Sequence, residues 1–396
     1  MSDITARHQR LLDVLVTGGK LTPPWLDAFT ALPRHQFIPD TIWDDSSGEL
    51  VPLRRADDPD RWWDMAYAPE AVITQVDDGH PTGADRRGRY ITSSASKPDV
   101  VALMLTALDA QPGMRVMEIG TGTGYNAALL AHRLGTGNVT SIEIDSQVAD
   151  HARDVLSASG YPLIVITDDG ARGYPPHAPY DRIIATAAVR QVPYAWVAQT
   201  RPGGSILTPW GTPYHNGALV RLTVNGDGTA EGRIVGDVAF MQLRDQRFRA
   251  TIDDDECDET TARTSHTAVT PYQVASDYDA SLAIGMTVPN CTPIYVRAEH
   301  YDDDARLWFV DPVTDSWANL VHQPDTSTYP VHQSGPRNLW DEIETAYHGW
   351  CQAGRPGPER WRITITAEGQ HVTLAETTTP GQLRAGSGRQ AHQFAS

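Results

Sequence analysis

A chain of 396 residues exceeds the usual size of one domain, so we expect two domains, each with its own hydrophobic core. The net charge of −18 argues against a surface that follows nucleic-acid phosphates, because such surfaces concentrate Lys and Arg. The sequence has neither an apolar run of membrane-spanning length nor a signal pattern at its start, so we expect a cytoplasmic protein without nucleic-acid or membrane partners. The spacing of the cysteines and histidines predicts neither a disulfide framework nor a metal site.

In chain order, the first pronounced feature is a polar section from Val76 to Gly88 that is typical of a loop. A broad apolar face then predicts a helix from Val100 that ends near Pro112-Gly113. From there, short apolar segments alternate with helical ones. The expected strands are 115–119, 139–144, 163–167, 182–186 and 205–208, and the expected helices are 125–134 and 146–159. This alternation predicts an α/β fold with a doubly wound parallel sheet, whose ligands bind at the carboxyl ends of the strands.

The pattern changes after Pro209. Segments 218–224 and 232–243, joined by the turn Asn225-Gly226-Asp227-Gly228, predict antiparallel edge strands. Strands at 293–297 and 361–365 and a helix at 338–352 predict a smaller C-terminal α+β domain. The acidic blocks at 253–256 and 302–304 are typical of solvated loops. We place the first domain at residues 1–245, an acidic linker at 246–262, an accessory or substrate-recognition domain at 263–380 and a disordered tail at 381–396.

The segment VMEIGTGTGY at 116–125 predicts a strand, a glycine-rich turn and the start of a helix. Glycines in this turn allow the backbone to approach a ligand that a Cβ would obstruct. Glu143 ends the next strand, where a carboxylate accepts hydrogen bonds from ribose hydroxyls. Asp169 follows the third strand, where an acid can meet an adenine amino group. Three successive strand ends therefore carry groups suited to a nucleoside.

The spacing GxGxG separates two nucleotide classes, because Tyr125 stands where a dinucleotide-binding GxGxxG motif has its third glycine. This spacing favours S-adenosylmethionine (SAM), whose adenosine and methionine ends have no phosphates to cradle. The alternative is that the glycines only form a tight strand-to-helix turn. The residues expected to bind the cofactor are Glu118, Gly120, Thr121, Gly122, Tyr125, Glu143, Ile144, Asp169, Gly170 and Thr186.

The chain from about Leu32 to Leu243 resembles the protein-L-isoaspartate O-methyltransferase family. The matching segments are PRHQFIP at 33–39, Ala66-Tyr67, Ser96-Lys97-Pro98, EIGTGTGY at 118–125, Asp169-Gly170, HAPYDRIIATAA at 177–188 and Pro202-Gly203-Gly204. The resemblance implies a Rossmann-like SAM-dependent methyltransferase that esterifies a carboxylate in a peptide or protein, after which the ester collapses to a succinimide. A carboxylate is already ionised at neutral pH, so positioning and exclusion of water supply the rate rather than a general base.

The resemblance also implies roles for the hydroxyl-rich segment YITSSASKPD at 90–99. Ser96 matches the serine that places the substrate carboxylate, so Ser96 and, with it, Ser94 are the expected catalytic residues. Tyr67, Ser93 and Lys97 are expected to contact the substrate. The residues leave another interpretation open, because Ser96-Lys97-Pro98-Asp99 also fits a helix capping box. Both roles can coexist at a helix start.

Two departures from the family pattern bear on the substrate. After Ala66-Tyr67 the chain continues into APEAVIT and the polar section, where the family has an acidic residue and then Ile-Gly, and the region after Leu243 is extra. We therefore expect a monomer or weak dimer that tailors a ribosomally made peptide, converting an ordinary aspartate of a cyclised precursor into an aspartimide. The alternatives are a general L-isoaspartate repair enzyme, a small-molecule methyltransferase and a non-catalytic peptide-binding homologue.

Overall fold

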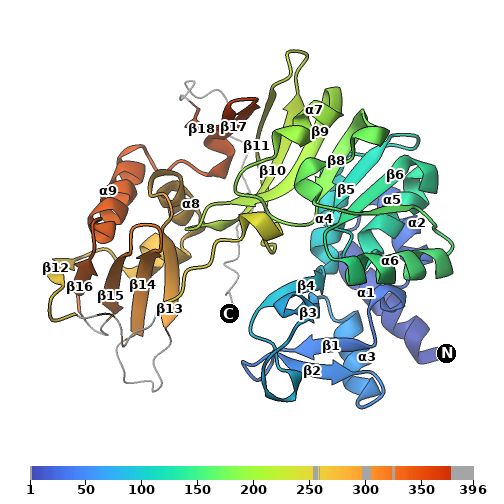
Figure 1. The fold of residues 1–396 in the computed structure, drawn as a ribbon, viewed down its shortest axis with the longest axis horizontal. Helices are drawn as coiled ribbons and strands as arrows, with labels where there is room; N and C mark the ends of the chain where they lie inside the picture. Colours follow the sequence, from blue (N-terminus) through green and yellow to red (C-terminus); the bar gives the residue numbers. More distant parts are fainter. Residues whose placement is uncertain (1, 253–256, 258, 297–304, 323–325, 376–396) are drawn as a thin grey trace. The chain divides into compact units, whose positions relative to one another are not determined.

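The computed structural model describes residues 2–252, 257, 259–296, 305–322 and 326–375 (Figure 1). The chain divides into two compact units, of which one comprises residues 1–113, 121–168 and 373–396 and the other comprises 114–120 and 169–372. This division does not follow the domain boundaries expected from the sequence, which stay a prediction. The acidic blocks at 253–256 and 302–304 and the expected tail at 381–396 lie outside the described residues. In the described part of the chain, every helix is too short or too polar to span a membrane.

The first unit contains a small antiparallel sheet, a parallel strand pair and most of the long helices (Figure 1). Its helices are α1 (Ser2–Thr17), α2 (Pro23–Ala31), α3 (Pro59–Tyr67), α4 (Pro98–Leu108), α5 (Tyr125–Leu134) and α6 (Ser146–Ala158). Its strands are β1 (Thr41–Asp44), β2 (Val51–Arg54), β3 (Val72–Val76), β4 (Ile91–Ala95), β6 (Val139–Glu143) and β7 (Ile164–Thr167). The antiparallel sheet has the order β2-β1-β3-β4, and β6 pairs with β7 in parallel.

Local sequence signals explain where the helices of this unit begin. Asp145 precedes α6, and its carboxylate accepts the backbone N–H groups of Gln147 and Val148, which would otherwise lack partners in the first turn. Proline opens α2, α3 and α4, where its missing N–H costs nothing. The predicted helices at 125–134 and 146–159 are confirmed as α5 and α6, and the predicted helix from Val100 as α4.

The second unit contains a mixed sheet and a separate antiparallel sheet. Within the unit, the mixed sheet has the order β17 (Trp361–Thr366), β11 (Ala230–Asp237), β10 (Asn216–Val224), β9 (Thr200–Gly211), β8 (Tyr180–Ala185) and β5 (Val116–Ile119). The strands β5, β8 and β9 run parallel, and the rest pair antiparallel. The expected antiparallel strands after Pro209 are therefore confirmed, although the second one ends at Asp237 rather than at Leu243. The strand β18 (Gly369–Leu374) crosses the unit boundary.

The C-terminal region is rich in sheet. The strands β12 (Arg263–Thr267), β16 (Tyr329–Ser334), β15 (Ser316–His322), β14 (Ala305–Asp311) and β13 (Thr292–Val296) form an antiparallel sheet in that order. The helices of this unit are α7 (Tyr194–Gln199), α8 (Tyr278–Thr287) and α9 (Leu339–Gln352). Rings of Phe309 and Trp340 meet at 5.6 Å where α9 covers the sheet (Figure 1). The strand β17, expected in an accessory domain, pairs instead with β11 of the mixed sheet.

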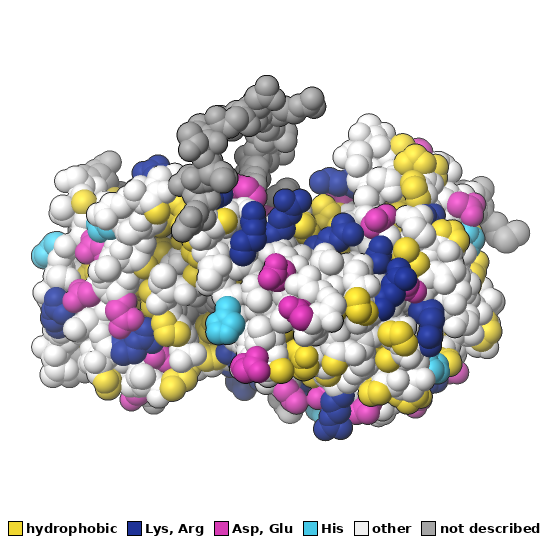
Figure 2. Space-filling view, turned by 90° about the horizontal axis from the view of Figure 1, so that it is seen from above, with side chains coloured by type: hydrophobic (Ala, Val, Ile, Leu, Met, Phe, Trp, Pro, Cys, Tyr) yellow, Lys and Arg dark blue, Asp and Glu magenta, His cyan; other side chains and the backbone are white. Residues whose placement is uncertain are grey.

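The surface carries both signs of charge. Figure 2 shows Lys and Arg side chains among Asp and Glu side chains on the face in view, with hydrophobic side chains between them. The net charge of −18 is thus accompanied by basic groups on this face. At about 0.1 M salt, dissolved ions screen the interactions between exposed charges that lie more than about 10 Å apart.

Candidate active site

The first half of the glycine-rich turn lies in the second unit, at the end of β5. Gly120 has φ of +88°, a conformation that residues with a Cβ rarely adopt. A Cβ at this position would lie 2.8 Å from Thr186 Oγ1, the hydroxyl that donates to the Gly120 carbonyl at 2.5 Å. Glu118 is fully buried in the same strand. Glycine is therefore required here by backbone conformation and by the close approach of Thr186.

The second half of the turn and the expected ribose acid lie in the first unit. The Gly122 N–H donates to Glu143 Oε2 at 2.9 Å, and the Asp145 N–H donates to Glu143 Oε1 at 3.1 Å. Thr121 is held against β6 by a bond between its hydroxyl and that of Ser141 at 2.6 Å. Burial raises the pKa of Glu143, and the two backbone donors counteract part of that effect. The carboxylate is fixed at the strand end with lone pairs left for further donors.

The other residues expected to bind the cofactor differ in their burial and in their contacts within the protein. Asp169 caps a short turn through its bond from the Ala171 N–H, and the neighbouring Gly170 carbonyl accepts from the Trp196 indole at 2.8 Å. Tyr125 is buried, with Phe29 and Phe37 at ring distances of 6.0 Å and 5.3 Å. Ile144 is partly exposed directly after Glu143. Cofactor contacts of these residues stay a prediction, and Tyr125 has a packing role in addition.

The hydroxyl-rich segment runs from β4 into α4. Ser93 and Ser94 lie in β4, and Ser96 follows the strand. The helix N-cap is Lys97, and no side chain caps it. The capping box expected at Ser96 is therefore wrong, because Pro98 restricts Lys97 to an extended backbone and moves the helix start one residue later. Within the described residues, the Ser96 hydroxyl has no hydrogen-bond partner and can donate to a substrate.

A buried guanidinium holds this segment in place. Arg34, in the short helix η1 (Arg34–Phe37), is 1% exposed and donates hydrogen bonds to five backbone carbonyls. The acceptors are Ala66 (3.1 Å), Ala68 (3.2 Å), Glu70 (2.8 Å), Ala95 (3.0 Å) and Ser96 (3.1 Å). Burial lowers the pKa of Arg34 to about 10, so the group stays charged at neutral pH. We did not predict this role from the sequence, because Arg34 was noted only as part of the family-like segment PRHQFIP at 33–39.

Two of the side chains expected to contact the substrate already have partners within the protein. Tyr67 is 8% exposed, and its hydroxyl forms a hydrogen bond with His35 Nδ1. Lys97 forms an ion pair with Glu70 at 3.3 Å. Because the Glu70 carbonyl accepts from Arg34, this ion pair adds a second link between the Ser96 segment and residues 66–70. Among the described residues, no three His, Cys, Asp or Glu side chains gather as a metal site would require.

The positive-φ glycine turn at Gly122, with the Glu143 carboxylate fixed at the end of β6, is an arrangement typical of nucleoside-binding α/β proteins, the class to which SAM-dependent methyltransferases belong. The family model described as Protein-L-isoaspartate(D-aspartate) O-methyltransferase (PCMT) matches residues 67–248. The protein-L-isoaspartate O-methyltransferase of Methanopyrus kandleri is 34% identical over 240 residues, which cover 60% of this chain and 90% of the relative. That of Thermococcus sibiricus is 40% identical over 247 residues, covering 61% and 95% respectively. The chain belongs to the protein-L-isoaspartate O-methyltransferase family, and its cofactor is SAM.

A solved structure titled protein-L-isoaspartate O-methyltransferase supports the fold. It matches with a TM-score of 0.53 at 19% identity, covering 93% of this chain and 100% of that chain. The match therefore extends well beyond residue 248, into the region that we expected to be extra. The fold of that solved structure thus also covers part of the C-terminal region of this chain.

Proposed function

We propose that the chain methylates the free carboxylate of an L-isoaspartyl residue in a peptide or protein. The observation that carries the proposal is the Arg34 clamp, which joins residues 66–70 to residues 95–96. These are the two segments that the family resemblance assigns to the substrate. The family relatives support this reading better than tailoring of a ribosomally made peptide.

The chemistry follows from how these residues would act. Bound SAM supplies a methyl group on a positively charged sulfur. Glu143 and the turn at Gly122 would hold the nucleoside end, and the Ser96 hydroxyl would donate to one oxygen of the substrate carboxylate. The other oxygen would accept the methyl group from the sulfur, and S-adenosylhomocysteine would remain as the second product. The peptide nitrogen that follows then attacks the ester carbonyl, methanol leaves and a succinimide forms.

A second candidate is methylation of an ordinary aspartate in a constrained peptide. The sequence favours it through the polar section at 76–88, which departs from the family pattern. Such a substrate would need the same cofactor and the same placement of a carboxylate. The two candidates differ only in which carboxyl isomer reaches the methyl group.

The distinguishing experiment offers matched peptides to the purified chain with SAM. Three versions of one sequence are compared: linear with L-isoaspartate, linear with aspartate and cyclised with aspartate. We expect mass spectrometry to show gain of one methyl and then loss of methanol, at least about tenfold faster for L-isoaspartate. Faster methylation of the cyclised aspartate peptide would instead establish the second candidate.

Replacing Ser96 by Ala should slow methyl transfer without weakening cofactor binding. A hydrogen bond to a charged group contributes about 1.5–3 kcal/mol, so we expect kcat/KM for the peptide to fall roughly ten- to hundredfold. Calorimetric titration with S-adenosylhomocysteine should give an unchanged Kd. Ser96→Thr keeps a hydroxyl and should retain most activity. Equal activity of the Ala and Thr variants would remove Ser96 from the proposed mechanism.

A further inference from the structure

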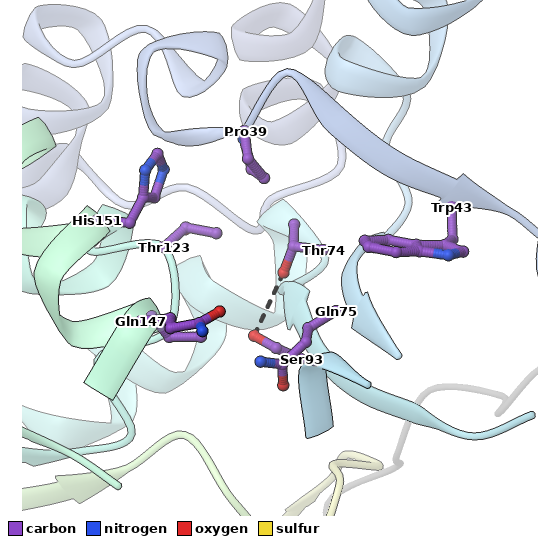
Figure 3. A pocket seen from close by; sticks show the side chains of 11 residues that line it. Pro39, Trp43, Thr74, Gln75, Ser93, Thr123, Gln147 and His151 are labelled. Atoms are coloured by element: carbon purple, nitrogen blue, oxygen red, sulfur yellow. Dashed lines mark hydrogen bonds between the residues drawn. The ribbon is translucent and has the colours of Figure 1, made fainter. Parts of the chain in front are cut away.

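A pocket of about 230 Å³ lies in the first unit beside the glycine-rich turn. Its lining residues are Pro39, Trp43, Thr74, Gln75, Gly79, Ser93, Gly122, Thr123, Gln147, Val148 and His151. Figure 3 shows the Gln147 side chain pointing from α6 towards Thr74 and Ser93. The pocket thus lies between the first turns of α6 and the strands β3 and β4.

The pocket is distinct from the expected cofactor site. Of the residues expected to bind SAM, only Gly122 is among its lining residues. Its volume is also below the roughly 300–1,000 Å³ that enclose a complete drug-sized ligand. It therefore suits one part of a larger molecule that reaches the glycine turn from the side of β4.

Both sides of the pocket are held by hydrogen bonds. Thr74 donates to the Ser93 hydroxyl at 3.3 Å, a bond drawn in Figure 3. Gln75 Nε2 donates to Asp145 Oδ2 at 3.2 Å, and the other oxygen of Asp145 caps α6. The Gln75–Asp145 bond ties β3 directly to the start of α6 and limits their separation at the pocket. A pocket with fixed walls can discriminate by shape and charge.

Its location connects the pocket to the substrate. Ser93 precedes the predicted catalytic Ser94, and the same strand leads to Ser96 under the Arg34 clamp. Gly79 belongs to the polar section at 76–88, where the chain departs from the family pattern. The pocket is therefore built partly from residues that set this chain apart.

The lining contains no carboxylate, ammonium or guanidinium group. Thr, Ser and Gln side chains and the His151 imidazole supply its polar atoms, Trp43 and Pro39 supply apolar surface, and Asp, Glu, Lys and Arg do not occur among the lining residues. A charged side chain that entered would lose water and would meet no carboxylate, ammonium or guanidinium among the lining residues. We propose that this pocket receives an uncharged side chain that neighbours the methylated residue in the peptide. This inference rests on the proposed function and adds a sequence preference to it.

The test uses seven-residue peptides with a central L-isoaspartate. The residue on either side is varied in turn among Asn, Tyr, Lys and Asp. Two quantities are measured for each peptide: kcat/KM for methyl transfer, and the Kd for enzyme saturated with S-adenosylhomocysteine. At one flanking position we expect Asn or Tyr to be favoured at least about tenfold over Lys and Asp in both quantities.

A change of charge at Gln147 tests whether the flanking side chain of the peptide binds in this pocket. Gln147 is exposed in the first turn of α6, where a glutamate is compatible with the helix dipole. Gln147→Glu should shift the preference between Lys and Asp peptides at least about tenfold towards Lys, at the same flanking position. Ser146→Glu adds the same charge at the adjacent exposed residue outside the lining and should produce a clearly smaller shift.

The outcomes separate this inference from the proposed function. Methylation of all peptides without discrimination, or equal shifts for Gln147→Glu and Ser146→Glu, overturns the pocket and leaves the function standing. If the Kd values differ between the peptides and Gln147→Glu changes that preference, but no peptide is methylated, the pocket is supported and the proposed methyltransferase function is overturned. Peptides that neither bind nor react overturn both.

Discussion

Arg34→Lys is expected to lower kcat/KM for the isoaspartyl peptide at least about tenfold while leaving the Kd for S-adenosylhomocysteine unchanged. The planar guanidinium reaches five carbonyls, whereas an ammonium has three donors and a different shape. Carbonyls left without a donor in a buried position cost about 1–3 kcal/mol each, so thermal unfolding should also begin at lower temperature. Kinetics, calorimetry and a thermal melt on the same preparation measure these three effects.

The matched control is Arg61→Lys, because Arg61 is a half-exposed arginine of the same unit that bonds to Asp44. It should alter neither kinetics nor the melting temperature appreciably, since exposed ion pairs contribute about 0–1 kcal/mol. A purely structural role for Arg34 would lower activity and cofactor binding together at temperatures near the melt. Normal kinetics of folded Arg34→Lys would show that the clamp does not position Ser96.

Glu143→Gln should weaken S-adenosylhomocysteine binding roughly ten- to hundredfold. An amide keeps one acceptor but replaces the other carboxylate oxygen with a donor, so the ribose diol loses a charge-assisted bond contributing about 1.5–3 kcal/mol. Isothermal titration gives the affinity. Glu231→Gln, an exposed change with the same loss of charge, should leave the affinity unaltered.

The free energy of unfolding of this variant should depend on pH differently from that of the parent. Because burial raises the pKa of Glu143, the folded state holds the proton more tightly than the unfolded state. The contribution of Glu143 to stability is therefore largest at low pH and falls as the pH rises through the raised pKa. Gln cannot ionise, so this pH-dependent part of the stability should be absent from the variant. Its amide nitrogen leaves one of the two backbone N–H groups without an acceptor, which should cost about 1–3 kcal/mol at any pH. A clearly lower melting temperature at neutral pH would mean that the carboxylate itself supports the fold.

Sequence by itself determined the local structure of the cofactor turn. The limits of α5 agree with the predicted 125–134, and β6 and β7 end within one residue of expectation. Glycine positions, an Asp N-cap and apolar periodicity each act over a few residues, so they can be recognised directly in the sequence. The pairing of β17 with β11 could not be predicted in this way, because apolar periodicity identifies a strand but not the strand that it pairs with.

Only the tertiary structure decided how the candidate substrate side is held. Arg34 meets carbonyls that lie 32 to 62 positions further along the chain, and no local pattern encodes such acceptors. The helix start at Lys97 followed from Pro98, which outweighed the apparent capping box. Trp43, Gly79 and Gln147 share a pocket only because β1, the polar section and α6 fold together. The sequence therefore determined the cofactor class, and long-range packing decided which residues we propose to position and select the peptide.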